Sequence, residues 1–277
     1  MTGFGERTRA ALARFGCLCV GIDPHPSLLA AWGLSETAEG ARAFGMRVVD
    51  AAAGRVGIVK PQVSFFERYG AAGYAALEDV LRAGRDAGLV VIGDAKRGDI
   101  GSTMDAYAQA WLTPGAPLEV DALTVNPFLG VQALAGAFDL AASAGKGVLV
   151  LAATSNPEGA GVQRARLADG ATVSGGIVAD VSARNAAHTP AGAWGDLGFV
   201  IGATVDWTTA GLPVPQPPTP ILAPGFGHQG AVPSELGRRF GAAAPTVIAT
   251  ESRSILSAGP DRLADTIATR AEEYIRG

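Results

Sequence analysis

Residues 94–99 read DAKRGD and place four ionisable side chains directly after the apolar run GLVVIG. In an extended strand, residues two apart share a face, so Asp94 and Lys96 point the same way. Gly98 loosens the backbone at the strand exit, and Asp99 opens the following loop. An ammonium held beside carboxylates keeps its proton, can offset a developing negative charge, and can then supply that proton. The position of this cluster at the strand exit favours a functional site, although a lone acid–base pair is more often a salt bridge that closes the strand end.

Polar side chains also stand at the ends of other apolar runs. Asp23, Lys60 and Asn126 each end such a run, and Ser155 follows another. The carboxyl ends of parallel strands meet on one rim, so these groups should converge there. A barrel built only for packing has no need of such a rim, and the set therefore favours a functional site.

Eight short β-type runs alternate with helical stretches. Most are nearly continuous apolar sequences, which is typical of parallel strands covered on both faces. We predict strands at 17–23, 56–60, 89–94, 120–126, 147–154, 197–204, 220–225 and 245–250. Eight strand–helix units predict an α/β fold, a (β/α)8 TIM barrel, which needs roughly 250 residues. A doubly wound open sheet ranks second, because no GxGxxG follows the first strand.

The helices expected between these strands show apolar residues three and four apart. They span 36–53, 71–87, 101–112, 130–144, 174–188 and 260–276. Two insertions, near 156–172 and 204–220, are predicted to be loops. Prolines near the end of the second insertion favour a semi-rigid, extended connector. Residues 1–277 are therefore predicted to form a single barrel domain.

Composition and charge limit the partners. The formal charge of −4 gives no general attraction for nucleic acid or an anionic membrane, so an anionic ligand needs a local cluster of donors. No segment approaches the roughly 18 consecutive apolar residues of a membrane span. The N-terminal segment carries Arg7, Arg9 and Arg14 and lacks the apolar core of a signal peptide. We expect a cytoplasmic protein that binds neither nucleic acid nor membrane.

Several motifs together resemble the orotidine 5′-monophosphate decarboxylase family. The stretch DAKRGDIGST fits the pattern DxKxxDxxxT, and VGID, VK, SNPEG, APGFGHQG and SRSI occur in the order of the family. The DxKxxD core alone is shared with sugar-phosphate decarboxylases and hexulose-phosphate synthases on related barrels. The whole set is far more specific and spans nearly the whole chain. The length, the DPHP after the first strand and the two insertions look most like the longer bacterial branch.

This resemblance implies a cofactor-free homodimer that converts orotidine 5′-monophosphate to uridine 5′-monophosphate and CO₂, the last step of de novo pyrimidine synthesis. Loss of CO₂ from C6 leaves electrons that the ring π-system cannot accept, so their stabilisation must be electrostatic. By resemblance, Lys60, Asp94, Lys96 and Asp99 form an alternating array, in which Lys96 offsets the charge and protonates C6. Asp99 and Thr103 would cross the dimer interface into the neighbouring site.

A glycine-rich stretch and an arginine are suited to a phosphate. APGFGHQG places Gly225, Gly227 and Gly230 after the seventh strand, where backbone N–H groups can approach an anion. Arg253 follows the eighth strand, so the two features share the usual phosphate position of barrels. Each feature alone is better explained as a common glycine-rich turn or a surface arginine. Together they favour phosphate binding.

The resemblance also implies the remaining substrate contacts. Gln229 would bridge phosphate and base, and Ser155 would recognise the pyrimidine edge. Asp23 and the partner subunit's Thr103 would hold the ribose hydroxyls, with Lys60 also near the ribose. Ser252 departs from the family pattern, in which many relatives have glycine before the arginine.

Two other functions stay open. One is a metal-dependent sugar-phosphate decarboxylase or aldolase, which would lose activity with a chelator. The other is a non-catalytic nucleotide-binding barrel, which would bind uridine 5′-monophosphate without turnover. The three histidines, His25, His188 and His228, are dispersed, so we expect solvent-facing or turn roles and no metal site.

Overall fold

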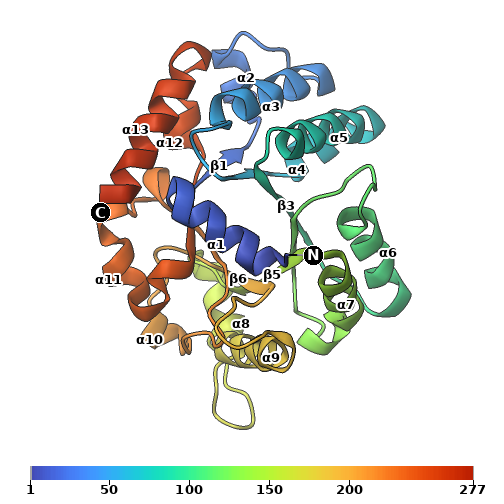
Figure 1. The fold of residues 1–277 in the computed structure, drawn as a ribbon, viewed down its shortest axis with the longest axis vertical. Coiled ribbons are helices and arrows are strands. Elements are labelled where there is room, and N and C mark those ends of the chain that lie inside the picture. The colour runs from blue at the N-terminus through green and yellow to red at the C-terminus, as the bar shows by residue number, and fades with distance from the viewer. Residues whose placement is uncertain (1, 277) are drawn as a thin grey trace.

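The strands of the computed structural model, which describes residues 2–276, form a closed parallel barrel in chain order (Figure 1). Their bounds are β1 Leu18–Ile22, β2 Ile58–Pro61, β3 Val90–Arg97, β4 Ala122–Val125, β5 Gly147–Ala153, β6 Leu197–Ile201, β7 Ile221–Pro224 and β8 Val247–Glu251. Each strand pairs in parallel with the next, and β8 closes on β1. All eight predicted strands are confirmed, and the open-sheet alternative is wrong.

The six predicted helices are also confirmed, two of them beginning with a 3₁₀ turn. They are α3 Ala38–Ala52, α5 Gly70–Asp86, α6 Gly101–Leu112, η1 Val131–Leu134 with α7 Ala135–Ala144, α9 Val173–His188, and η6 Pro260–Arg262 with α13 Leu263–Arg276. The structure adds α1 Phe4–Phe15 and shorter elements: α2 Pro26–Ala31, α4 Ser64–Glu67, η4 Pro233–Glu235, α11 Leu236–Phe240, η5 Gly241–Thr246 and α12 Arg253–Leu256. These additions lie mainly in the strand–helix connections, where short turns leave little periodic signal.

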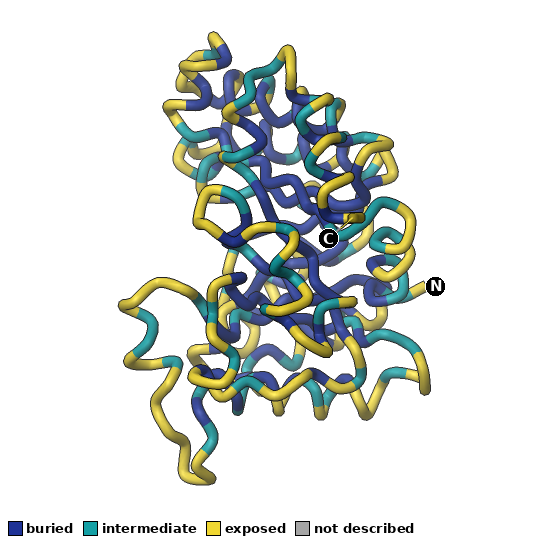
Figure 2. Tube along the Cα trace, turned by 90° about the vertical axis from the view of Figure 1, so that its left-hand side faces the viewer, coloured by how far each residue is buried: buried dark blue, intermediate teal, exposed yellow. Residues whose placement is uncertain are grey.

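Both faces of the strands are buried, which explains their nearly continuous apolar sequences. In β1, Leu18, Val20 and Ile22 belong to the core between barrel and helices, whereas Cys19 belongs to the cluster inside the barrel. Figure 2 shows this buried centre enclosed by exposed loops and outer helix faces. Eight strands therefore bury two apolar layers and position the loops at their carboxyl ends.

Helix α1, absent from the predicted elements, lies across one end of the barrel (Figure 1). Its Phe4 is fully buried and packs with the inward-facing residues Cys19, Ile58, Val90, Ile92, Ala122, Leu149, Val200, Leu222 and Ile248. A Cβ at Gly147, the first residue of β5, would overlap the Phe4 ring. Glycine at this position thus leaves room for the Phe4 ring, which fills the amino-terminal end of the barrel. The carboxyl-terminal end, where barrel enzymes have their active sites, stays open.

The two insertions are mostly irregular. Residues 156–172 contain the single-turn elements η2 Pro157–Gly159 and α8 Ala160–Gln163, followed by an exposed loop that protrudes at the bottom of Figure 1. Residues 204–220 contain only α10 Trp207–Ala210 before the proline-rich connector. No helix within residues 2–276 has the length and apolarity to cross a bilayer.

Candidate active site

The carboxyl ends of the strands surround a cavity of about 240 Å³. Its lining joins charged residues at the carboxyl ends of β1, β2 and β3 to the glycine-rich loop after β7 and the arginine after β8. The polar members are Asp23, His25, Lys60, Gln62, Asp94, Lys96, His228, Gln229, Thr250, Ser252 and Arg253. The cavity therefore unites the two groups of residues that the sequence pointed to, although they lie more than a hundred positions apart.

Asp94 is the centre of a buried ionic network. Lys60 Nζ donates to its Oδ2 at 2.9 Å, and Lys96 Nζ donates to its Oδ1 at 2.6 Å. Lys60 Nζ also lies 3.9 Å from Asp23 Oδ1 and donates to Gln62 Oε1 at 3.1 Å. The Lys60 and Asp94 side chains are 6% and 9% exposed, whereas that of Lys96 is 42% exposed. One carboxylate thus holds two ammonium groups, and only that of Lys96 is widely accessible.

An irregularity in β3 places Lys96. The pairing of β3 with β4 shifts register between Gly93 and Arg97. Within this shift Lys96 has φ +50°, a left-handed conformation that is costly for a residue with a side chain. Thr124 of β4 stabilises it: its Oγ1 accepts the Lys96 N–H at 2.9 Å and donates to Asp94 Oδ1 at 3.0 Å. The left-handed backbone conformation of Lys96 and the buried Thr124 hydroxyl therefore position the Lys96 ammonium beside the Asp94 carboxylate.

The network keeps its charges. Burial alone raises the pKa of Asp94, but the Lys60 and Lys96 ammonium groups outweigh burial and hold this pKa well below its ordinary value. Burial likewise lowers the pKa of Lys60, but Asp94 and Asp23 outweigh it and shift the pKa upward. Near neutral pH, Asp94 is therefore a carboxylate and Lys60 an ammonium.

Three buried oxygen atoms that line the cavity make no hydrogen bond to any residue in the 2–276 range. They are Asp23 Oδ1, Thr250 Oγ1 and Ser252 Oγ. Buried polar atoms usually have partners, because desolvation without a hydrogen bond is costly. Hydroxyl and carboxylate groups of this kind suit the hydroxyl and phosphate groups of a ligand.

The phosphate side contains most of its predicted residues. Gly225, Gln229 and Arg253 line the cavity, and Arg253 begins α12. Gly227 does not line it: a Cβ on this residue would point at Ser254 and Glu251, and its N–H donates to the Ala231 carbonyl at 2.9 Å. The N–H of Gly230 donates to the Gly227 carbonyl at 2.9 Å, which ends the single-turn element η3 Gly227–Gln229. Of the three glycines, only Gly225 is left at the cavity.

The other predicted site residues lie outside the cavity of the single chain. Asp99 accepts the Ile100 N–H at 2.8 Å on its Oδ1, and Thr103 is exposed in the first turn of α6. Ser155 is exposed after β5. Their predicted substrate contacts stay predictions.

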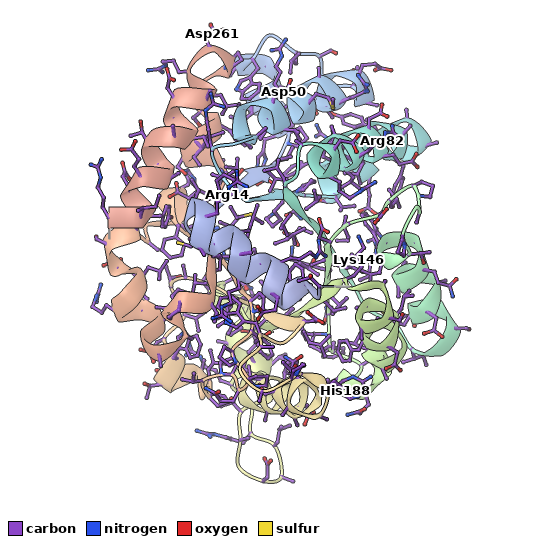
Figure 3. All side chains as sticks on the ribbon, viewed as in Figure 1. Arg14, Asp50, Arg82, Lys146, His188 and Asp261 are labelled. Atoms are coloured by element: carbon purple, nitrogen blue, oxygen red, sulfur yellow. The ribbon has the colours of Figure 1, made fainter. Side chains whose placement is uncertain are left out.

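The structure adds residues that the sequence analysis did not assign. Gln62 accepts a hydrogen bond from the Lys60 ammonium, and Thr124 accepts one from the Lys96 backbone N–H. Residues two apart in a strand share a face, and this alternation is the sequence signal that could have identified Gln62 from Lys60. His25 and His228 line the cavity with Arg253. Burial lowers the pKa of His25, as does Arg253, against the opposing effect of Asp23. His188 is exposed at the end of α9, on the periphery of Figure 3.

The fold and the site define a (β/α)8-barrel enzyme with a lysine–aspartate network and an arginine in its open mouth. The model of the orotidine 5′-phosphate decarboxylase / HUMPS family matches residues 16–265, and the chain belongs to that family. This result confirms the resemblance seen in the motifs.

Relatives extend over nearly the full chain. An orotidine 5′-phosphate decarboxylase of Salinispora arenicola is 52% identical over 261 residues, covering 94% of this chain and 92% of the relative. One of Streptomyces coelicolor is 48% identical and covers 99% of this chain and 96% of the relative. A Streptomyces avermitilis crystal structure, described as a proposed orotidine 5′-phosphate decarboxylase, matches with a TM-score of 0.93 and 45% identity, covering 100% of this chain and 96% of that one.

Proposed function

We propose that this protein converts orotidine 5′-monophosphate to uridine 5′-monophosphate and CO₂, the last step of de novo pyrimidine synthesis. The observation that carries the proposal is the unbroken run of ion pairs from Lys60 through Asp94 to Lys96, in the same cavity as Arg253. A substrate with a phosphate at one end and a developing carbanion at the other needs cationic groups at both ends. The cavity supplies them.

Lys96 carries the chemical step. As the bond between C6 and the carboxylate breaks, CO₂ leaves and the electron pair stays on C6 beside the ammonium. Lys96 Nζ then gives its proton to C6, and the resulting amine takes a proton from water. Asp94 stabilises the ammonium before the reaction, because the two groups are 2.6 Å apart.

Binding of the phosphate contributes to the rate. Enzymes lower barriers by about 8–23 kcal/mol. One well-placed donor contributes about 3–4 kcal/mol, so Lys96 alone does not account for the whole effect. Arg253 and the loop after β7 hold the phosphate and use remote binding energy to keep C6 at the ammonium. The oxygen atoms of Asp23, Thr250 and Ser252 are the partners for ribose and phosphate.

The active assembly in this proposal is a homodimer in which Asp99 and Thr103 serve the site of the partner. Three large apolar side chains, Ile100, Phe128 and Leu129, are 61%, 78% and 53% exposed on the loops after β3 and β4. These loops are adjacent, since the Asn126 N–H donates to the Arg97 carbonyl at 2.7 Å. Exposed apolar side chains on two adjacent loops at the carboxyl end of the barrel support an interface at this place.

Mixing of two inactive variants tests this arrangement. If Asp99 acts across the interface, a heterodimer of Lys96→Ala and Asp99→Ala subunits contains one intact site, so a random mixture should recover about one quarter of the wild-type activity. If Asp99 acts within its own chain, every site stays defective and mixing recovers nothing. Gel filtration of each variant verifies that both still assemble.

The overall function is tested by the loss of orotidine absorbance with purified protein, with and without EDTA. Rapid loss that EDTA does not affect supports the proposal. Loss of activity with EDTA would favour a metal-dependent sugar-phosphate enzyme, and binding of uridine 5′-monophosphate without turnover would favour a nucleotide-binding barrel. The proposal includes a cytoplasmic location, which cell fractionation checks.

A further inference from the structure

A buried carboxylate lies behind the phosphate side of the cavity and takes no part in the chemical step. Glu251 is the last residue of β8, and its side chain has no exposed surface. Tyr274 Oη donates to its Oε1 at 2.7 Å, Ser254 Oγ donates to its Oε2 at 2.5 Å, and Arg270 Nε lies 3.2 Å from Oε2. Burying an ion pair gains little stability over an apolar packing of the same shape. Stability alone therefore does not explain a carboxylate at this place, and the position of its partners indicates another role.

The partners and packing neighbours of Glu251 come from three segments of the chain. Tyr274 and Arg270 belong to α13, whereas Ser254 lies in α12 directly after Arg253. Gly227, in the loop after β7, packs on the same contact: a Cβ there would lie 2.5 Å from Glu251 Oε2 and closer still to Ser254 Oγ. With φ +69°, this residue also has a conformation that favours glycine. The loop after β7 and the first turn of α12, which together form the phosphate side of the cavity, therefore both contact the hydrogen-bonded pair Glu251 and Ser254.

We infer that Glu251 is a positioning residue for the phosphate site. Its carboxylate holds the Ser254 hydroxyl, which fixes the first turn of α12 and with it the start of the Arg253 side chain. The same pair forms the surface on which Gly227 places the loop that carries Gln229. A charged acceptor holds a hydroxyl more strongly than a neutral one. Arg270 balances the negative charge, so that the carboxylate does not repel a nearby phosphate.

The inference rests on the proposed function, and a binding measurement separates the two. Calorimetry with the intact protein gives Kd for uridine 5′-monophosphate and for uridine, which lacks the phosphate. Glu251→Gln keeps the shape but removes the charged acceptor, and it should raise the Kd for uridine 5′-monophosphate about tenfold. The Kd for uridine should stay unchanged. A failed decarboxylation assay would overturn the proposed function without altering this comparison.

A merely structural role gives a different result. It would lower the melting temperature and the fraction of active protein, but Kd does not depend on that fraction. An unchanged Kd for uridine 5′-monophosphate, or an equal rise for uridine, would overturn the inference. If Glu251→Gln does not fold, Ser254→Ala takes its place, since it removes only the hydroxyl and should raise the same Kd selectively. An unchanged Kd in that variant also overturns the inference.

Two residues provide matched controls. Glu273 pairs with the same Arg270, at 2.5 Å from Nη1, but it lies at the surface, and the Ser254 hydroxyl donates to Glu251. Glu273→Gln should leave both Kd values unchanged. Tyr274→Phe removes a hydrogen bond from the other carboxylate oxygen, so it should lower the melting temperature with little effect on either Kd. A selective loss of uridine 5′-monophosphate binding in Glu273→Gln would assign the effect to Arg270 and contradict the role of Glu251.

Discussion

Replacement of Asp94 by Asn isolates the charge at the centre of the network. The change keeps the size of the side chain but leaves the buried Lys60 ammonium with the neutral Gln62 amide at 3.1 Å and the Asp23 carboxylate at 3.9 Å. The interaction that is lost, at 2.9 Å, corresponds to about 6 kcal/mol at an effective dielectric constant of 20. The second ion pair, between Asp94 and Lys96, is lost at a smaller cost, because water hydrates the half-exposed Lys96 ammonium in its place. Breaking one side of a buried pair costs about 3–5 kcal/mol, and we expect a loss of this size.

Urea unfolding at neutral pH measures the loss, and Asp79→Asn is the matched control. Asp79 also pairs with two cations, Arg42 at 2.6 Å and Arg82, but on the protein surface. Exposed pairs contribute about 0–1 kcal/mol, so the control should be nearly as stable as the wild type. Equal free energies of unfolding for the two variants would refute the reasoning that burial gives the Asp94 network its strength.

Three further outcomes follow from the site. Arg253→Ala should lower kcat/KM about a hundredfold while the melting temperature stays constant, because the residue is exposed; unchanged steady-state kinetics would contradict its role. Ser252→Ala should weaken binding of uridine 5′-monophosphate up to about tenfold in calorimetry, and equal affinity would contradict a substrate contact. The stability advantage of the wild type over Asp94→Asn should be complete above about pH 5 and should shrink as the pH falls below the ordinary Asp value of 3.8, because the folded-state pKa is depressed. Urea titrations in which the advantage grows toward acid would disprove that linkage.

The barrel and the charged part of the site were predictable because their signals are local. Near-continuous apolar runs mark strands buried on both faces, and the two-residue alternation joins Asp94 to Lys96. Helix α1 was not predicted, since its main contact, Phe4 inside the barrel, depends on residues from distant strands. Its role follows from closure of the sheet and not from the segment itself.

Other parts of the site depend on pairing that no local pattern reveals. Thr124 is an ordinary polar residue in an apolar strand, and only the register shift between β3 and β4 brings it to Asp94 and Lys96. Gly227 matched a phosphate-loop spacing, yet its neighbours are Glu251 and Ser254. Glycine spacing predicts a tight loop, but the direction of each N–H is set by the contacts of that loop.

The most direct test of the central claim is the rate of decarboxylation by Lys96→Ala, measured with saturating orotidine 5′-monophosphate. The variant keeps the buried Lys60–Asp94 pair and should fold and bind uridine 5′-monophosphate. We expect kcat to fall by about a thousandfold or more, because both the stabilising charge and the proton donor are gone. A folded variant with kcat close to the wild-type value would contradict the claim that this ammonium drives the reaction.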